Sequence, residues 1–466
     1  MMIELNKVKL LSFFTILTYS FFIYSYANLS LSLNYLMISF LSVLTLIISI
    51  VILKINKNHN NSIIFLFFVS ISLFIFGRFI AIALSELLGM PNFVDNTYQL
   101  FQVTWMNSFT PTLNEQRQLF IIINFFCLFL TLGFVFNKKK SFKEIKINHP
   151  KSFLLIALLL FWLVYPYKFY LTYQTIQLTL LLGYKGLYAN AINESNLAII
   201  NLIFFTSFAI IVTKSRHYKI YMIAFLFLGL FSGLTGSRGD LVSYLLTLVY
   251  VYYHKNNKKI NAIKIILILL LAYLIMIGVY SLSSRAENQS ISKSDPLLQF
   301  IFDQGITLSV VGFSLFSNID YPIHTLLQSF IPLMFKIYSY IEPDVKFYTS
   351  SITNFVSYNA NPKMFLSGAG LGSSIISEIY IFSFRNIALF SVILFFFGRI
   401  LFFIEIKSKY NEFYSIFMIS ILPLLLFSPR NGLNVLFVSS IYILILICIF
   451  YLLSSLISKV TLIKRN

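Results

Sequence analysis

The sequence is poor in cysteine, glycine, proline and charge, and each scarcity excludes a class of protein. Its 466 residues include 2 cysteines, 17 glycines and 11 prolines, and only 11% of the residues are charged. Cys127 and Cys448 both lie within apolar runs, so we expect no disulfide, no metal site and no redox role. No flexible linker and no repeat of fixed period divides the chain, and we expect a single domain over residues 1–466.

Apolar residues are correspondingly abundant. They make up 58% of the chain, which includes 52 phenylalanines, and the mean hydropathy is +0.83. This composition predicts an all-α polytopic membrane protein. A bilayer core about 30 Å thick needs about 20 apolar residues per helix. We expect about twelve transmembrane helices, near residues 9–28, 31–53, 63–89, 118–136, 152–172, 196–213, 220–236, 240–253, 265–282, 386–404, 414–428 and 433–456.

Basic residues recur at every second connection between these apolar segments. The N-terminus and the six connections or tail segments that follow even-numbered helices hold 22 Lys and Arg against 4 acidic residues. The remaining positions hold 13 basic and 12 acidic residues. By the positive-inside rule this alternation places both termini in the cytoplasm. The net charge of +19 is therefore a topology signal, and we expect no nucleic-acid partner.

One predicted outer connection is far longer than the others. It runs over residues 283–385, between the ninth and tenth predicted helices, and long loops without structure are uncommon unless they are functional. Two apolar runs within it, 297–316 and 325–340, could lie in the interface or dip into the membrane as re-entrant helices. If both runs crossed, the helix count would be fourteen, and charge alone does not separate the two arrangements.

Ionisable residues at membrane depth each cost about 2.5 to 3.5 kcal/mol to insert, so those present are functional candidates. Arg238 and Asp240 stand two residues apart in the predicted tight turn between two apolar stretches. Arginine suits bidentate capture of phosphate or carboxylate. Five arginines could line one outward-facing cavity: Arg78, Arg238, Arg285, Arg385 and Arg430. Simple interfacial anchoring remains open for Arg385 and Arg430, and local pairing with Glu287 for Arg285.

A glycine-rich stretch, "NPKMFLSGAGLGSSIISEIY" at 361–380, is the second candidate site. Gly370 and its small neighbours could present backbone N–H groups to an anion at the start of a helix running through Ile375. Glu378 falls in the first turns of that helix, as a base or as a helix N-terminal charge. No Ser/His/Asp arrangement and no metal-ligand spacing is visible in the sequence.

Three stretches carry a resemblance to a known family: "GLTGSRGDLVSYLL" at 233–246, "FDQGITLSVV" at 302–311, and the glycine-rich stretch. With these, and in its predicted layout, the chain resembles the Wzy-type O-antigen polysaccharide polymerases of Gram-negative bacteria. The resemblance implies a GT-C-like fold in the inner membrane, with an active site that faces the periplasm.

The resemblance also implies a reaction and its partners. Such enzymes move a growing glycan from undecaprenyl diphosphate onto a lipid-linked repeat unit, with membrane lipids around them and a chain-length regulator and flippase in the same pathway. Neither a nucleotide sugar nor a metal or other cofactor is expected. On this basis, Arg238 and Arg285, and next Arg78 and Arg430, would stabilise the leaving diphosphate. Candidate bases for the attacking hydroxyl are Glu378, Asp303 and Asp240, unranked.

Two other functions remain open at this point. An O-antigen ligase would share the arginines and the long outer loop. A lipid-linked oligosaccharide flippase or transporter belongs to a different class, and transporters usually show internal repeats with charges near the membrane midplane. The sequence shows no such repeat, and its charges gather towards the outer side.

Overall fold

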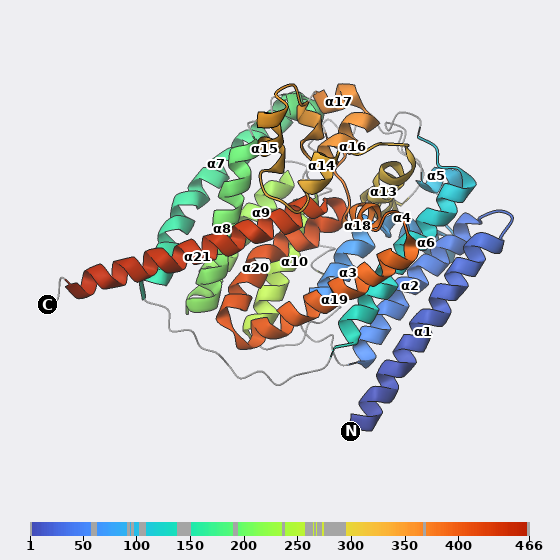
Figure 1. Cartoon of the computed structure of the whole chain (residues 1–466), viewed down its shortest axis with the longest axis horizontal. Helices are drawn as coiled ribbons and strands as arrows, with labels where there is room; N and C mark the ends of the chain where they lie inside the picture. Colours follow the sequence, from blue (N-terminus) through green and yellow to red (C-terminus); the bar gives the residue numbers. More distant parts are fainter. Residues whose placement is uncertain are drawn as a thin grey trace.

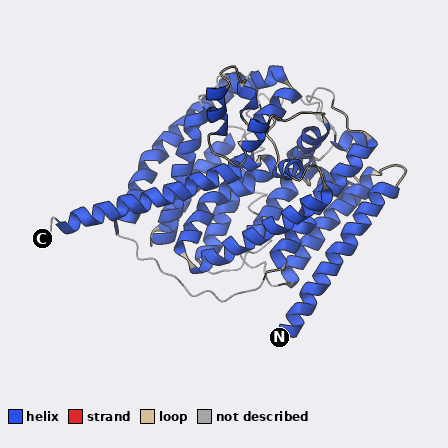
Figure 2. Cartoon of the chain, viewed as in Figure 1, coloured by secondary structure: helices blue, strands red, loops and turns tan. Residues whose placement is uncertain are grey.

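In the computed structural model the chain folds into a bundle of helices, and no strand occurs among the residues that it describes (Figures 1 and 2). Those residues are 2–56, 63–90, 94, 97–101, 109–137, 151–189, 194–234, 238–256, 264, 267, 273–274, 295–366 and 370–463.

Within the described ranges, ten helices of 16 residues or more build the bundle. They are α1 (Met2–Leu29), α2 (Tyr35–Ile55), α6 (Leu113–Val135), α7 (Lys151–Ala189), α8 (Glu194–Lys214), α9 (Tyr218–Leu234), α10 (Arg238–Lys255), α19 (Ile387–Tyr410), α20 (Glu412–Phe427) and α21 (Leu433–Ile463). Within the described residues, eight segments are long and apolar enough to cross a membrane, or nine if the bent pair α3 (Ile63–Phe74) and α4 (Gly77–Leu87) counts as one. The chain is therefore a polytopic helical protein, as the composition predicts.

Eleven of the twelve predicted apolar segments coincide with described helices, and the twelfth, 265–282, falls largely outside the described residues. The boundaries differ by five residues or more at several places, and the predicted segment 63–89 is divided into the two helices α3 and α4. Helix α7 runs on to Ala189, well past residue 172, with Pro166 inside the helix and the Thr172 hydroxyl donating to the Lys168 carbonyl. Helix α6 starts at Leu113, where Thr112 and Glu115 form a capping box.

Helix α6 is the most buried of the candidate membrane spans in the described part of the chain. In its most apolar window 89% of residues are buried, against 28% in the corresponding windows of α1 and α21, which lie at the periphery (Figure 1). It crosses α19 where two glycines meet: a Cβ on Gly133 would lie 1.9 Å from the Phe395 carbonyl oxygen, and one on Gly398 would lie 2.3 Å from that of Leu130. Small residues at such crossings let membrane helices approach closely.

The long predicted loop is largely helical where it is described. It contains α12 (Pro296–Gln304), α13 (Thr307–Phe316), α14 (Ile323–Leu327), α15 (Met334–Ile341), the 3₁₀ turn η2 (Phe347–Ser350), α16 (Ile352–Ala360), α17 (Pro362–Leu366) and α18 (Ile375–Phe382). Helices α15, α16 and α17 lie at the end of the bundle opposite the N-terminus (Figure 1). The run 296–316 is long and apolar enough to span but is interrupted after Gln304. Twelve and fourteen crossings therefore both remain predictions.

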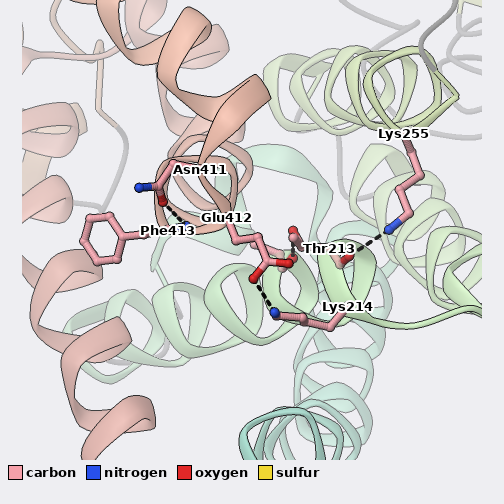
Figure 3. Close-up of polar contacts among 7 residues, drawn as sticks. Thr213, Lys214, Lys255, Asn411, Glu412 and Phe413 are labelled. Atoms are coloured by element: carbon pink, nitrogen blue, oxygen red, sulfur yellow. Dashed lines mark hydrogen bonds and ion pairs between the residues drawn. The ribbon is translucent and has the colours of Figure 1, made fainter. Parts of the chain in front are cut away.

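The opposite end, called the basic end here, joins residues of the predicted cytoplasmic connections (Figure 3). Lys214 at the end of α8 forms an ion pair with Glu412 at the start of α20. The Lys255 ammonium donates to the Thr213 carbonyl at 2.7 Å, and that of Lys9 donates to the Asn137 carbonyl at 2.5 Å. The ends of α1, α6, α8, α10 and α20 thus meet on one side, which is the arrangement that the alternating basic connections predict.

Candidate functional site

Helix α3 ends at Phe74, and the chain changes direction by 73° before it continues as α4. Arg78 is the second residue of α4 and is only 5% exposed. Its guanidinium donates to the Leu100 carbonyl at 2.7 Å and to the Ser309 hydroxyl at 2.8 Å, and it lies 4.9 Å from the centre of the Phe302 ring. Asp303 is the acidic group that acts on it electrostatically. The structure therefore brings together Arg78 and Asp303, two of the predicted site residues.

Two glycines make this meeting possible. The interruption between α12 and α13 falls at Gly305, which rests against the break between α3 and α4. A Cβ on Gly77 would lie 2.4 Å from the Ile301 carbonyl oxygen, and one on Gly305 would lie 2.4 Å from the Arg78 nitrogen. Because backbone atoms are the obstacle, only glycine permits the two interrupted helices to cross here.

Arg430 lies in η3 (Ser428–Arg430), the 3₁₀ turn between α20 and α21. Its guanidinium carbon is 6.0 Å from the centre of the Phe74 ring, which also packs edge-on against Phe427. The first turn of α10 lies against the Phe427 ring, because a Cβ on Gly239 would lie 2.2 Å from Phe427 Cε2. Arg430, the end of α3 and the start of α10 are thus neighbours.

Arg238 and Asp240 lie in the first turn of α10, rather than in the tight turn before it that the sequence predicts. The backbone of Arg238 therefore lies close to Phe427, while its side chain is outside the described part of the structure. Arg285 is outside the described residues altogether. Arg385 is described and exposed, in a left-handed conformation just after α18.

Glu378 is fully buried in α18, the helix that the glycine-rich stretch predicts. One of its carboxylate oxygens accepts the Leu433 N–H at 2.7 Å, and the Asn434 N–H also acts on the carboxylate. Gly432 leaves room for this contact, since a Cβ there would lie 2.0 Å from Glu378 Oε1. Burial raises the pKa of Glu378 to about 7. The carboxylate therefore caps α21 at the turn that follows Arg430.

Gly370 lies in the segment before α18 and is exposed, with only an ordinary contact, 3.5 Å from its Cβ position to the Ser357 hydroxyl. The N-terminus of α18 is capped by Ser374, whose hydroxyl accepts the Ile376 N–H at 3.3 Å. Gly372, at φ +79°, lies against the Arg430 carbonyl. The glycine-rich stretch thus reaches the 3₁₀ turn η3 through its last glycine.

These contacts join the ends of α3, α4, α10, α12, α18 and α21 into what we call the break region. It comprises Arg78, Asp240, Asp303, Glu378 and Arg430 with the backbone around them. Discontinuous helices at such places mark ion and substrate sites in many membrane proteins. Among the residues that the structure describes, no three His, Cys, Asp or Glu groups gather to hold a metal ion.

Lys168 is a buried cation near the end of the predicted apolar segment 152–172, and it was not among the candidate site residues chosen from the sequence. It lies inside α7 and is 7% exposed, and its ammonium contacts Asn201 and Tyr244 near Asp240. The signal available in the sequence was a lysine within the run "YPYKFY", followed by a further apolar stretch.

Comparison with known proteins agrees with the resemblance of the sequence motifs. The family model described as O-antigen polysaccharide polymerase Wzy matches residues 10–461. Neither a curated protein nor a solved structure matches the chain. The family match covers nearly the whole chain and every residue of the break region, so the chain belongs to the Wzy family of O-antigen polysaccharide polymerases.

Proposed function

We propose that this protein joins O-antigen repeat units at the periplasmic face of the inner membrane. It transfers the growing glycan from one undecaprenyl diphosphate onto the non-reducing end of a repeat unit carried by another. Family membership supports polymerisation. The observation that carries the site is the buried Arg78, held where two interrupted helices cross, with Arg430 on the other side of the α3 break.

The proposed chemistry uses charges of the break region in two ways. The bond between the anomeric carbon and the diphosphate oxygen breaks, the acceptor hydroxyl oxygen bonds to that carbon, and the hydroxyl proton passes to a carboxylate. Arg78 and Arg430, with Arg238 and Arg285, stabilise the charge that develops on the diphosphate. Preorganised donors in a water-poor site supply much of such a rate enhancement.

The three candidate carboxylates differ in access. Asp240 and Asp303 are partly exposed, whereas Glu378 is fully buried against the first turn of α21. A base must reach the attacking hydroxyl within hydrogen-bond distance. We therefore assign proton transfer to Asp303 or Asp240, and to Glu378 the positioning of the segment that carries Arg430.

The lipid tails of both substrates would lie along apolar helix faces, among membrane lipids. Aromatic residues of the long predicted outer connection, residues 283–385, would stack on the sugars. Tyr348 and Tyr358 of that segment stack on each other with ring centres 3.9 Å apart, and Phe355 and Phe365 extend this aromatic group. A chain-length regulator and a flippase of the same pathway are the proposed protein partners.

A deletion strain tests the reaction. Cells without the protein should display lipid A-core capped with single repeat units, and complementation should restore the glycan ladder. Loss of all surface O-antigen would instead indicate a ligase. Accumulation of repeat units on the cytoplasmic leaflet would indicate a flippase.

The role of the arginines is tested by Arg238→Lys, which keeps the charge and loses the bidentate fork. We expect the ladder to collapse towards single repeats while the protein remains in the membrane. A full ladder in this variant would contradict the diphosphate role of Arg238.

A further inference from the structure

A second buried cation lies beside the break region, on α7, which contributes no residue to that region. Lys168 is placed about 25 Å along α7 from Lys151 at a rise of about 1.5 Å per residue, and its side chain is enclosed by α8 and α10. A lysine at this depth is costly, and such residues are kept mainly where a function needs them.

The contacts of the Lys168 ammonium are specific. It donates to the Asn201 side-chain oxygen at 2.5 Å, and the Tyr244 hydroxyl lies 3.3 Å away. The rings of Phe204 and Phe205 lie 4.5 and 5.2 Å from the nitrogen, within the range of cation–π attraction. The ammonium is therefore tied to α8 and α10 at once.

Helix α10 presents two groups to this ammonium. Asp240 and Tyr244 are four residues apart, so they share one face of the helix. The Tyr244 hydroxyl meets Lys168 directly, and the Asp240 carboxylate attracts it electrostatically. Lys168 thus acts on the first turn of α10, which begins at Arg238.

The partner on α10 is itself held firmly. The Tyr244 ring stands at 4.7 Å from that of Phe225 in an edge-on arrangement. A Cβ on Gly229 would lie 2.9 Å from that of Tyr244, so α9 and α10 are in close contact there. The position of Tyr244, and with it the direction from which Lys168 approaches α10, is fixed by packing.

We infer that Lys168 is a positioning residue for glycan transfer: through Tyr244 and Asp240 its ammonium fixes the first turn of α10, and so the geometry of the break region. This inference rests on the proposed function. Lys168 acts on the reaction through α10, and the substrate itself contacts the residues of the break region. Misplacement of a reacting group by about 1 Å can cost about 100-fold in rate.

The first test compares two lysines of this helix assembly. Lys168→Met removes the ammonium but keeps a long apolar side chain. Lys255→Met is the matched control, because Lys255 lies at the basic end of α10 and contacts Thr213 and the Tyr218 ring. With purified protein and undecaprenyl diphosphate-linked repeat units, we expect Lys168→Met to lower kcat by about 100-fold with little change in KM, and Lys255→Met to leave both unchanged.

Tyr244→Phe serves if Lys168→Met does not insert or fold. It removes a single hydroxyl and keeps the ring that packs against Phe225. We expect kcat to fall by about 5-fold, as for the loss of one hydrogen bond. An unchanged kcat in Tyr244→Phe would overturn the inference.

A double-mutant cycle separates positioning from packing. If Lys168 acts through Asp240, Asp240→Asn already removes the coupling, and Lys168→Met added to it lowers kcat by much less than it does alone. If the two effects multiply, or if Lys168→Met is no worse than Lys255→Met per folded molecule, the inference is wrong. Failure of the proposed function would appear elsewhere, as a deletion strain without the single-repeat phenotype.

Discussion

The two ends of the helix bundle treat charge in opposite ways. At the basic end, Lys214 pairs with Glu412, and Lys409 lies 3.7 Å from Glu405, with both lysines partly exposed. Arg78 in the break region and Lys168 beside it are buried; they bond Leu100, Ser309 and Asn201, and Asp303 and Asp240 act on them electrostatically. Exposed pairs contribute about 0 to 1 kcal/mol, whereas a buried charge costs several kcal/mol. The basic end therefore places lysines in partly exposed ion pairs, and the other end buries its cations, to which the proposed function assigns the binding of a negatively charged substrate.

The backbone also differs between the two ends: helices meet at a capped junction at the basic end and are interrupted in the break region. At the basic end, α19 passes into α20 at Asn411, whose side-chain oxygen caps the new helix by accepting the Phe413 N–H at 2.9 Å (Figure 3). In the break region, α3 and α4 are bent by 73°, and α12 is interrupted at Gly305. Interrupted helices expose backbone groups, and membrane proteins tolerate them where they line a cavity or a site.

The largest effect is expected from Arg78→Lys. Lysine keeps the charge, but it cannot bond Leu100 and Ser309 with a rigid fork while presenting donors to a diphosphate. Polymerisation should fall by about 100-fold per inserted molecule, as for the loss of a preorganised donor. Densitometry of the glycan ladder, normalised to membrane-inserted protein, measures it. Arg399→Lys is the control, because Arg399 is exposed and bonds Asn137 in the basic end. Equal glycan ladders in Arg78→Lys and Arg399→Lys would show that the arginine of the break region matters no more for polymerisation than the arginine of the basic end.

Gly305→Ala should follow in size. The added Cβ would lie 2.4 Å from the Arg78 backbone nitrogen, so α12 must move away from α4. Overpacking against backbone should cost about 3 kcal/mol of stability, visible as a lower unfolding midpoint in detergent. Gly370→Ala meets only the Ser357 hydroxyl at 3.5 Å and should stay within about 0.5 kcal/mol. If Gly305→Ala were as stable as Gly370→Ala, the contact between α12 and α4 at Gly305 would not be tight enough to require glycine. Lost activity in a stable Gly370→Ala would support the predicted substrate-binding role of Gly370.

Glu378 gives the break region a pH dependence. Its pKa is about 7 in the folded protein against 4.5 for an ordinary glutamate, because the carboxyl group is buried. The stability that this group contributes is complete below pH 4.5 and is lost as the pH rises through 7, on the order of 3 kcal/mol in all. Glu378→Gln should lack this dependence, so the gap between the two unfolding midpoints should change across pH 4.5 to 8. Parallel curves for wild type and variant would contradict the assignment.

The smallest effect belongs to the basic end. Lys214→Met removes the ion pair with Glu412. The Lys214 side chain is 20% exposed and that of Glu412 is 31% exposed. We expect a loss below about 1 kcal/mol and a normal ladder, with the midpoint measured in the same detergent series. A short ladder from this variant would give the basic end a part in the reaction.

Hydropathy and charge alternation predicted the helices and the grouping of the basic connections, because both depend on local composition. Arg78 and Asp303 were each chosen from the sequence, but their proximity arises where two interrupted helices cross at Gly77 and Gly305. No local pattern encodes a contact between residues so far apart in the chain.

The roles of Glu378 and Lys168 also could not be predicted from the sequence, because they depend on contacts with other helices. A carboxylate three residues into a helix is expected to interact with the start of its own helix. Glu378 instead caps α21, 55 positions further on, because Gly432 lets that helix approach. The role of Lys168 depends on Asn201 and Tyr244 from two other helices. Both assignments required the packed structure.

The central claim is that cations of the break region hold a departing diphosphate during chain transfer. The most direct measurement is the release of undecaprenyl diphosphate from lipid-linked repeat units by protein in lipid nanodiscs, for wild type, Arg78→Lys and Arg399→Lys. We predict one carrier released for each new glycosidic linkage in wild type and Arg399→Lys, and release about 100-fold slower in Arg78→Lys. Wild-type release by a folded Arg78→Lys protein would contradict the claim.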